Sequence, residues 1–128
     1  MNLTETFAVL KPGMGLETLP VTDTVFEDME SAYGGFSGHV LVATFRFDED
    51  WPTWERHPNG DELVTLISGR AEMILRTANG DQSVELTQPG DFIVVPRDTW
   101  HTARISEPTM MVFVTPGEGT ENVEQPPG

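Results

Sequence analysis

The sequence predicts an all-β fold, a sandwich or barrel of antiparallel strands, and three observations support this prediction. From residue 36 onward, short segments rich in β-branched and aromatic residues follow one another. They are separated by turn sequences such as PNGD, ANGD and QPGD, whose residues accept a positive φ or fix a bend. The 128 residues include 12 glycines and 10 prolines, and helical periodicity is almost absent. Many short strands joined by hairpins account for all three.

Three regions are expected along the chain. Residues 1–35 contain several Gly and Pro residues and no sustained hydrophobic period, so we expect an N-terminal arm, with one or two helical turns in TVFEDMESA. Residues 36–115 form the β-domain and begin with a strand over 36–47, whose residues alternate between two faces. Residues 116–128 are acidic and poor in apolar side chains, which predicts a short, flexible acidic tail.

Composition excludes several classes of partner and site. The formal net charge of −14 disfavours binding to nucleic acid or to an anionic membrane surface. The chain has no cysteine, so disulfides and thiolate ligands are excluded and any metal must be held by nitrogen and oxygen atoms. The N-terminus lacks the pattern of a signal peptide and no apolar run reaches about 20 residues, so we expect a cytoplasmic protein.

The chain has only three histidines, and the positions of two of them are informative. His57 precedes the first tight turn, and Glu62 starts the strand after that turn. His101 starts a later strand. Ligands at the starts of neighbouring strands of a rolled sheet can converge although they are far apart in sequence. We expect His39, on the apolar-looking face of the first strand, to be a core or interface residue.

The segment ERHPNGDELVTLISG resembles the first of the two motifs of the cupin family, which are small β-barrels of the jelly-roll kind. That motif places His-x-His before a Glu, and the Glu six residues before a Gly. Here Glu62 is followed by six residues and then Gly69, four residues separate His57 from Glu62, and Glu55 stands where the first histidine would be.

The second cupin motif is matched by GDFIVVPRDTWH. Gly90, Pro96 and His101 stand at the expected spacing, Asp98 takes a glycine position, and Ile105 replaces the usual Asn. The amino-acid sequences of both motifs are similar to those of small, single-domain bacterial cupins without an established reaction. The resemblance covers about residues 36–115 and implies the cupin-type barrel.

The resemblance also implies a site for one divalent transition metal, Fe, Mn, Zn or Ni, with Glu55, His57, Glu62 and His101 as ligands. Glu55 and His57 are two residues apart, so on an extended segment they point the same way. Glu55 has two alternatives: it could pair with Arg56 at the surface, or it could act as the catalytic base. Without it, two His and one carboxylate remain, as in non-haem iron oxygenases.

Alternation from Glu62 predicts which side chains line the barrel interior. These interior residues, together with two tryptophans beside the proposed ligands, form the expected substrate pocket: Trp54, Val64, Leu66, Met73, Phe92, Val94, Trp100, Ala103 and Phe113. Arg46 and Arg97 are the cations that could hold a substrate carboxylate.

Two functional hypotheses follow. The first is a metal-dependent cupin enzyme that acts on a small organic molecule by Lewis-acid or metal/O₂ chemistry, as an isomerase, decarboxylase, cyclase or dioxygenase. The alternative is a non-catalytic metal or small-molecule binding protein, such as a sensor; a metal-free structural barrel is a weaker third possibility. Cupins resembling this chain commonly pair by exchanging N-terminal strands or by packing sheets, so a homodimer is expected.

Overall fold

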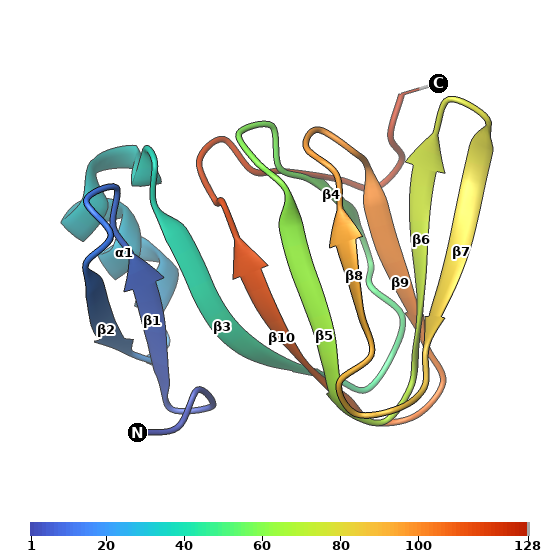
Figure 1. Ribbon diagram of the computed structural model, residues 1–128, viewed down its shortest axis with the longest axis horizontal. Coiled ribbons are helices and arrows are strands. Elements are labelled where there is room, and N and C mark those ends of the chain that lie inside the picture. The colour runs from blue at the N-terminus through green and yellow to red at the C-terminus, as the bar shows by residue number, and fades with distance from the viewer. Residues whose placement is uncertain (128) are drawn as a thin grey trace.

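The computed structural model describes residues 1–127 and contains two antiparallel sheets (Figure 1). The first sheet has six strands, in the spatial order β2 (Leu16–Pro20), β1 (Thr6–Leu10), β3 (Val40–Phe47), β10 (Thr109–Thr115), β5 (Glu62–Ser68) and β8 (Phe92–Val95). The second has five, in the order β11 (Glu121–Val123), β4 (Trp54–Arg56), β9 (His101–Ile105), β6 (Ala71–Thr77) and β7 (Gly80–Leu86). The predicted all-β, jelly-roll class is confirmed.

The strand ends coincide with the turn residues that the sequence contains. Gly69 lies between β5 and β6 with φ 83°, where a side chain is strained. A Cβ atom built there would lie 2.4 Å from the carbonyl oxygen of Pro108, so the close approach of this neighbouring loop also requires glycine. This turn fixes the start of β6 relative to β5.

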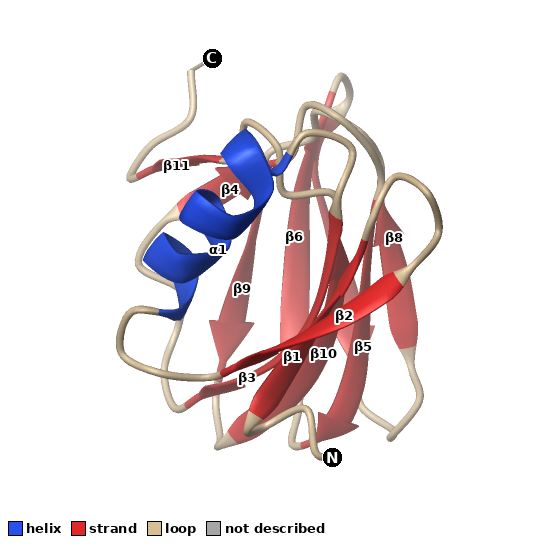
Figure 2. Cartoon of the chain, turned by 90° about the vertical axis from the view of Figure 1, so that its left-hand side faces the viewer, coloured by secondary structure: helices blue, strands red, loops and turns tan. Residues whose placement is uncertain are grey.

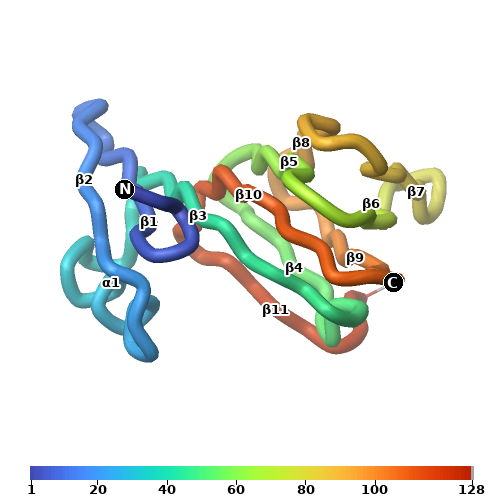
Figure 3. The backbone as a smooth tube through the Cα atoms, turned by 90° about the horizontal axis from the view of Figure 1, so that it is seen from below, coloured from blue at the N-terminus to red at the C-terminus, as the bar shows by residue number. Residues whose placement is uncertain are grey.

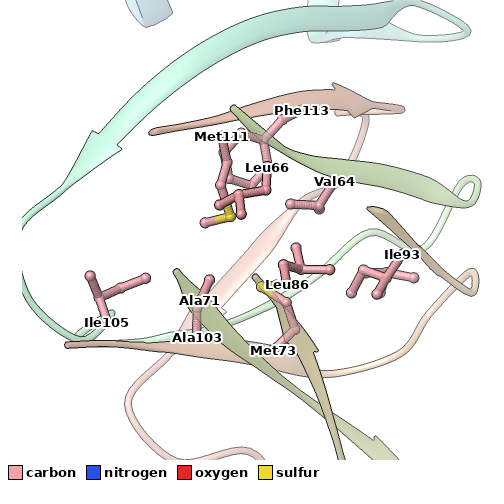
Figure 4. Packing of buried hydrophobic residues seen from close by; sticks show 11 residues of the cluster. Val64, Leu66, Ala71, Met73, Leu86, Ile93, Ala103, Ile105, Met111 and Phe113 are labelled. Carbon is pink, nitrogen blue, oxygen red and sulfur yellow. The ribbon is translucent and has the colours of Figure 1, made fainter. Parts of the chain in front are cut away.

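The main core lies between the inward faces of the two sheets (Figure 4). Val64 and Leu66 of β5 and Phe113 of β10 come from the first sheet, and Met73 of β6 and Ala103 of β9 come from the second. All five are at most 5% exposed. Their inward direction agrees with the alternation expected from the sequence.

The inward placement of Phe92 and Val94 is wrong, because both side chains are more than half exposed, at 58% and 51%. In the ladder between β5 and β8, Val64 lies opposite Ile93. Residues that face each other across an antiparallel pair point to the same side of the sheet. Ile93 therefore fills the core, and the two neighbouring residues point outward.

The N-terminal region extends the first sheet and covers one end of it (Figure 2). β1 and β2 form a hairpin, and β1 pairs with β3. Helix α1 (Val25–Tyr33) and the short helix η1 (Gly34–Phe36) follow. They form a second core cluster with β1 and β3, in which Phe7, Val25, Met29 and Leu41 are buried. The expected N-terminal arm is thus a hairpin followed by a helix.

The expectation of a free tail after residue 115 needs correction. β11 pairs with β4 in the second sheet, and the two run side by side in Figure 3. Asn122 lies opposite Glu55 in this ladder, and Pro126 is buried. The low apolar content of this segment was misleading, because backbone pairing with β4, rather than a hydrophobic face, holds β11 in place. Residue 128, at the end of the predicted tail, lies outside the described residues.

None of the described helices is both long and apolar enough to cross a membrane.

Candidate metal site

The four residues that match the metal ligands of the first and second motifs meet at one point of the structure. Glu55 lies on β4, His57 follows that strand, and Glu62 and His101 start β5 and β9. Glu62 lies between the two histidines: its Oε1 is 3.1 Å from Nε2 of His101, and its Oε2 is 3.2 Å from Nε2 of His57. Oε1 of Glu55 is 3.8 Å from Nε2 of His57.

Water is largely excluded from this cluster. The side chains of His57 and Glu62 are 3% exposed and that of His101 is fully buried, whereas Glu55 is 26% exposed. Candidate ligand atoms of Glu55, His57 and His101 all lie within 4.8 Å of one another. Buried polar groups need partners, and charged ones need them most.

Both imidazole rings are oriented through their Nδ1 atoms. Nδ1 of His101 lies 2.9 Å from the carbonyl oxygen of Thr99, which can only accept a hydrogen bond. Nδ1 of His57 lies 2.8 Å from Oγ1 of Thr120, whose single hydroxyl hydrogen is donated to the carbonyl of Gly117 at 2.9 Å. In both rings Nδ1 must therefore donate, which leaves the Nε2 lone pairs directed at Glu62.

This arrangement fits a metal ion. Nε2 of His57, Nε2 of His101 and Oε1 of Glu62 are all buried without a hydrogen-bond partner among the described residues. Lone pairs of nitrogen and oxygen about 3 Å apart repel each other unless a metal ion or a proton lies between them. Two imidazole nitrogens and carboxylate oxygens are ligands that divalent transition metals bind in proteins. The donor set thus matches a divalent metal held by nitrogen and oxygen.

The cluster shifts the pKa values of its members in different directions. Burial acts to raise the pKa of Glu62, but contact with His101 and His57 outweighs it and lowers the pKa to about 2. Burial acts to lower the pKa of His101, yet the neighbouring Glu62 raises it above the ordinary value. Burial, and then the charge of Glu62, raise the pKa of Glu55. Glu62 is thus a carboxylate at neutral pH, and Glu55 of the metal-free protein binds a proton more readily than an ordinary Glu.

A cavity of about 780 Å³ opens beside the cluster. Glu55, His57 and Glu62 contribute to its wall, and Phe113 is the predicted pocket residue that lines it. Val64, Leu66, Met73 and Ala103 belong instead to the packed core. The remaining aromatic wall comes from residues that the sequence did not single out as pocket residues: Phe26, Phe36, Phe45, Phe47 and Trp51. Alternation along residues 36–47 was a usable signal for two of them, Phe45 and Phe47.

The two predicted pocket tryptophans lie elsewhere. The Trp54 ring stacks under the guanidinium of Arg76 at 4.6 Å, and the Trp100 ring stacks under that of Arg56 at the same distance. Neither ring lines the cavity. Trp51 takes the position expected of them, because its ring lies 6.1 Å from that of His101 and forms part of the cavity wall.

The structure also places the other residues that the sequence analysis named. Arg46 borders the cavity, but Arg97 does not; its backbone N–H donates to Asp61 at 2.7 Å. His39 is outside the cluster and packs beside Tyr33. Asp98, in the glycine position of the second motif, has the φ of 62° that glycine would favour.

Comparison with known proteins agrees with this fold. A family profile described as a cupin domain matches residues 43–116. No curated protein matches the chain. A cupin-2 domain protein from Shewanella frigidimarina is 18% identical, with a TM-score of 0.52 over 60% of this chain and 70% of that one.

Two solved enzymes are also similar in fold. Oxalate decarboxylase of Bacillus subtilis, studied for its Mn(II) centres, is 23% identical with a TM-score of 0.54, over 66% of this chain and 23% of that one. Hydroquinone 1,2-dioxygenase of Sphingomonas sp. TTNP3 is 16% identical with a TM-score of 0.51, over 59% of this chain and 58% of that one. The chain thus spans less than two thirds of either enzyme. Since the family profile covers more than half of the present sequence, the chain belongs to the cupin family.

Proposed function

We propose that the protein is a metal-dependent cupin enzyme that acts on a small organic molecule. The observation that carries this proposal is the set of buried atoms without partners, Nε2 of His57, Nε2 of His101 and Oε1 of Glu62, next to a cavity. A site that only stabilised the fold would have its polar atoms paired. The Fe, Mn, Zn or Ni ion expected from the sequence suits these donors.

His57, Glu62 and His101 would hold the metal, and Glu55 is near enough to join them. A divalent metal in this place supplies a Lewis acid that polarises a carbonyl or hydroxyl group, or allows reaction with O₂ if it is redox-active. The hydroxyl of Thr115 donates to Oε2 of Glu62 at 2.6 Å and fixes the orientation of that carboxylate.

We assign to Glu55 the role of proton acceptor. It lines the cavity and is the most exposed of the four side chains. A carboxylate beside a Lewis-acid centre can take a proton from the activated substrate and return it. The similar fold of a decarboxylase and a dioxygenase supports enzymatic function in general, and isomerisation, decarboxylation, cyclisation and dioxygenation are all compatible with this site.

The test combines metal binding with a search for turnover. Calorimetric titration with Mn(II), Zn(II) and Ni(II), and with Fe(II) under anaerobic conditions, compares the parent with Glu55→Gln. Metal affinity within about threefold of the parent shows that Glu55 is not a metal ligand, as the assigned role of base requires. The metal-loaded parent and His101→Ala are then incubated with a library of small molecules and analysed by mass spectrometry. Turnover by the parent alone supports the proposal, and metal binding without turnover of any compound supports a binding or sensor role.

We also propose a homodimer formed through the N-terminal hairpin. β2 is the outermost strand of the first sheet, and its Leu16 is 68% exposed. An edge strand offers unpaired backbone groups to a second copy. Size-exclusion chromatography with light scattering checks this, and a monomer would contradict it. The cytoplasmic location stays a prediction from the sequence.

A further inference from the structure

The cavity beside the metal cluster has an aromatic wall that extends from its rim to the metal ligands. Phe26 of α1 is 56% exposed and stacks on Phe45 of β3, with the ring planes 18° apart and the centroids separated by 6.1 Å. Phe45 contacts Phe113 edge-on at 5.5 Å, and Trp51 lies 6.0 Å from Phe113. All four rings line the cavity.

A cavity of this size and composition suits a planar apolar ligand. Small-molecule pockets are commonly between about 300 and 1,000 Å³ and mostly apolar, with polar groups only where orientation is needed. Aromatic rings present flat faces and edges that pack against the ring of a ligand. A two-carbon dicarboxylate would leave most of the aromatic wall without a contact.

The charged side chains around the cavity are mostly negative. Beyond Glu55 and Glu62, the lining includes four more carboxylates: Glu30, Asp48, Glu49 and Asp50. Among the lining residues that the structure describes, Arg46 is the only arginine or lysine. Its side chain is 62% exposed and forms an ion pair with Asp48 at 3.4 Å.

This charge distribution has a direct effect on the ligand. Two positive charges on a divalent metal would be balanced by Glu55 and Glu62, and Arg46 offsets one of the other four carboxylates, so the potential at the entrance stays negative. An anionic substrate would lose its hydration, and its buried cationic partner would be a metal ion whose charge Glu55 and Glu62 already balance. A cationic substrate also loses hydration, but the carboxylates at the entrance attract it, and an uncharged substrate loses less hydration.

We propose that the substrate class of this site is a planar molecule with an aromatic or similarly flat apolar face and no negative charge. The inference rests on the proposed function in one respect, namely that the cavity beside the metal cluster is the substrate site. It sets this chain apart from oxalate-handling proteins of similar fold, because oxalate is a small dianion.

Three probes of nearly the same shape separate charge from shape: benzoate, benzamide and benzamidine, which are anionic, neutral and cationic at neutral pH. Their dissociation constants for the Mn(II)-loaded and the metal-free protein are measured by ligand-observed NMR, with oxalate as a fourth probe. We expect benzamide and benzamidine to bind at least about tenfold more tightly than benzoate, and oxalate to bind more weakly than benzamide. Tightest binding of benzoate or oxalate, or equal binding of all probes, would overturn the inference.

Salt and two sets of variants test whether the carboxylates and the aromatic wall cause the expected preference among the probes. The advantage of benzamide over benzoate should shrink at 1 M NaCl, where charges are screened beyond about 3 Å. Glu30→Gln combined with Glu49→Gln should bring benzoate closer to benzamide; the control is Glu107→Gln, an exposed carboxylate that does not line the cavity. Phe26→Ala should weaken all aromatic probes, whereas Phe92→Ala, an equally exposed ring on the outer face, should weaken none.

These measurements distinguish failure of the substrate class from failure of the proposed metal-dependent function. If His57→Ala abolishes metal binding and the probes bind in the opposite order, the substrate class is wrong and the metal site stands. If no metal binds and the probes keep the expected order, the metal-dependent function is wrong and the preference of the cavity stands.

Discussion

Oε1 of Glu62 lies 3.1 Å from Nε2 of His101 in a place where the carboxylate is 3% exposed and the imidazole is fully buried. The Nδ1–H of His101 is already donated to the backbone of Thr99, so Nε2 has no proton unless the ring is charged. A metal ion or a proton must therefore lie between these two atoms. This contact joins the two motifs, at the starts of β5 and β9. The predictions below on metal affinity and on the pH dependence of stability depend on it.

Thr120 should control metal affinity although it is not a ligand. Its hydroxyl accepts the Nδ1–H of His57 at 2.8 Å, and loss of such a contact to a metal-binding histidine lowers metal affinity by about 10- to 100-fold. We expect this loss for Thr120→Val and near-parental affinity for Thr120→Ser, which keeps the hydroxyl. Calorimetric titration with Mn(II) or Zn(II) measures it. Equal affinities for the two variants would show that the contact has no such role.

The stability of the metal-free protein should pass through a maximum with pH. The pKa of Glu62 is lowered from 4.5 to about 2, so its stabilising contribution is complete above about pH 4.5 and is lost as the pH falls toward 2. The pKa of His101 is raised above 6.5, so its contribution is complete below 6.5 and is lost as the pH rises through the raised value. The raised pKa of Glu55 makes its contribution fall above about pH 4.5 as well, so the maximum is expected toward the lower end of the interval from about pH 4.5 to 6.5.

Differential scanning calorimetry in EDTA, from about pH 3 to pH 9, checks this expectation. Saturating metal should remove the decline at high pH, because the metal binds the deprotonated imidazole. A metal-free protein whose Tm keeps rising up to pH 9 would contradict the assigned pKa directions.

Leu66→Ala should destabilise the domain strongly. Leu66 is 1% exposed in the core between the sheets, and truncation of a buried leucine costs about 2–5 kcal/mol through lost burial and the cavity that remains. The neighbouring Ile67 points outward and is 44% exposed, so Ile67→Ala should cost less than about 1 kcal/mol. Urea denaturation of both variants compares the two free energies of unfolding. Similar losses would mean that the register of β5 is shifted by one residue.

The sequence predicted the strands and the clustering of the proposed ligands better than the pocket. Spacing within the two motifs, anchored by Gly69 and Gly90, indicates which side chains start β5 and β9, and the resemblance to cupins implied that His57, Glu62 and His101 meet. The direction of Phe92 did not follow, because a short apolar strand does not reveal which of its faces points inward; only the pairing of Val64 with Ile93 decides it.

The cavity and the role of Thr120 depend on contacts between distant parts of the chain. Phe26 reaches the cavity because α1 packs on the cluster around Phe7 and Leu41, and no local pattern indicates that packing. Thr120 meets His57 because β11 pairs with β4, yet the composition of residues 116–128 is that of a tail without a core. Long-range pairing of polar segments leaves little trace in a single sequence.

The metal content of protein purified without chelators tests the central claim most directly. Plasma mass spectrometry is applied to the parent, to His57→Ala combined with His101→Ala, and to His39→Ala, which removes the histidine outside the cluster. We expect about one divalent transition-metal ion per chain in the parent and in His39→Ala, and almost none in the double variant. Equal metal content in the parent and the double variant, or a metal-free parent that takes up none of Mn(II), Fe(II), Zn(II) and Ni(II), would contradict a metal site at His57, Glu62 and His101.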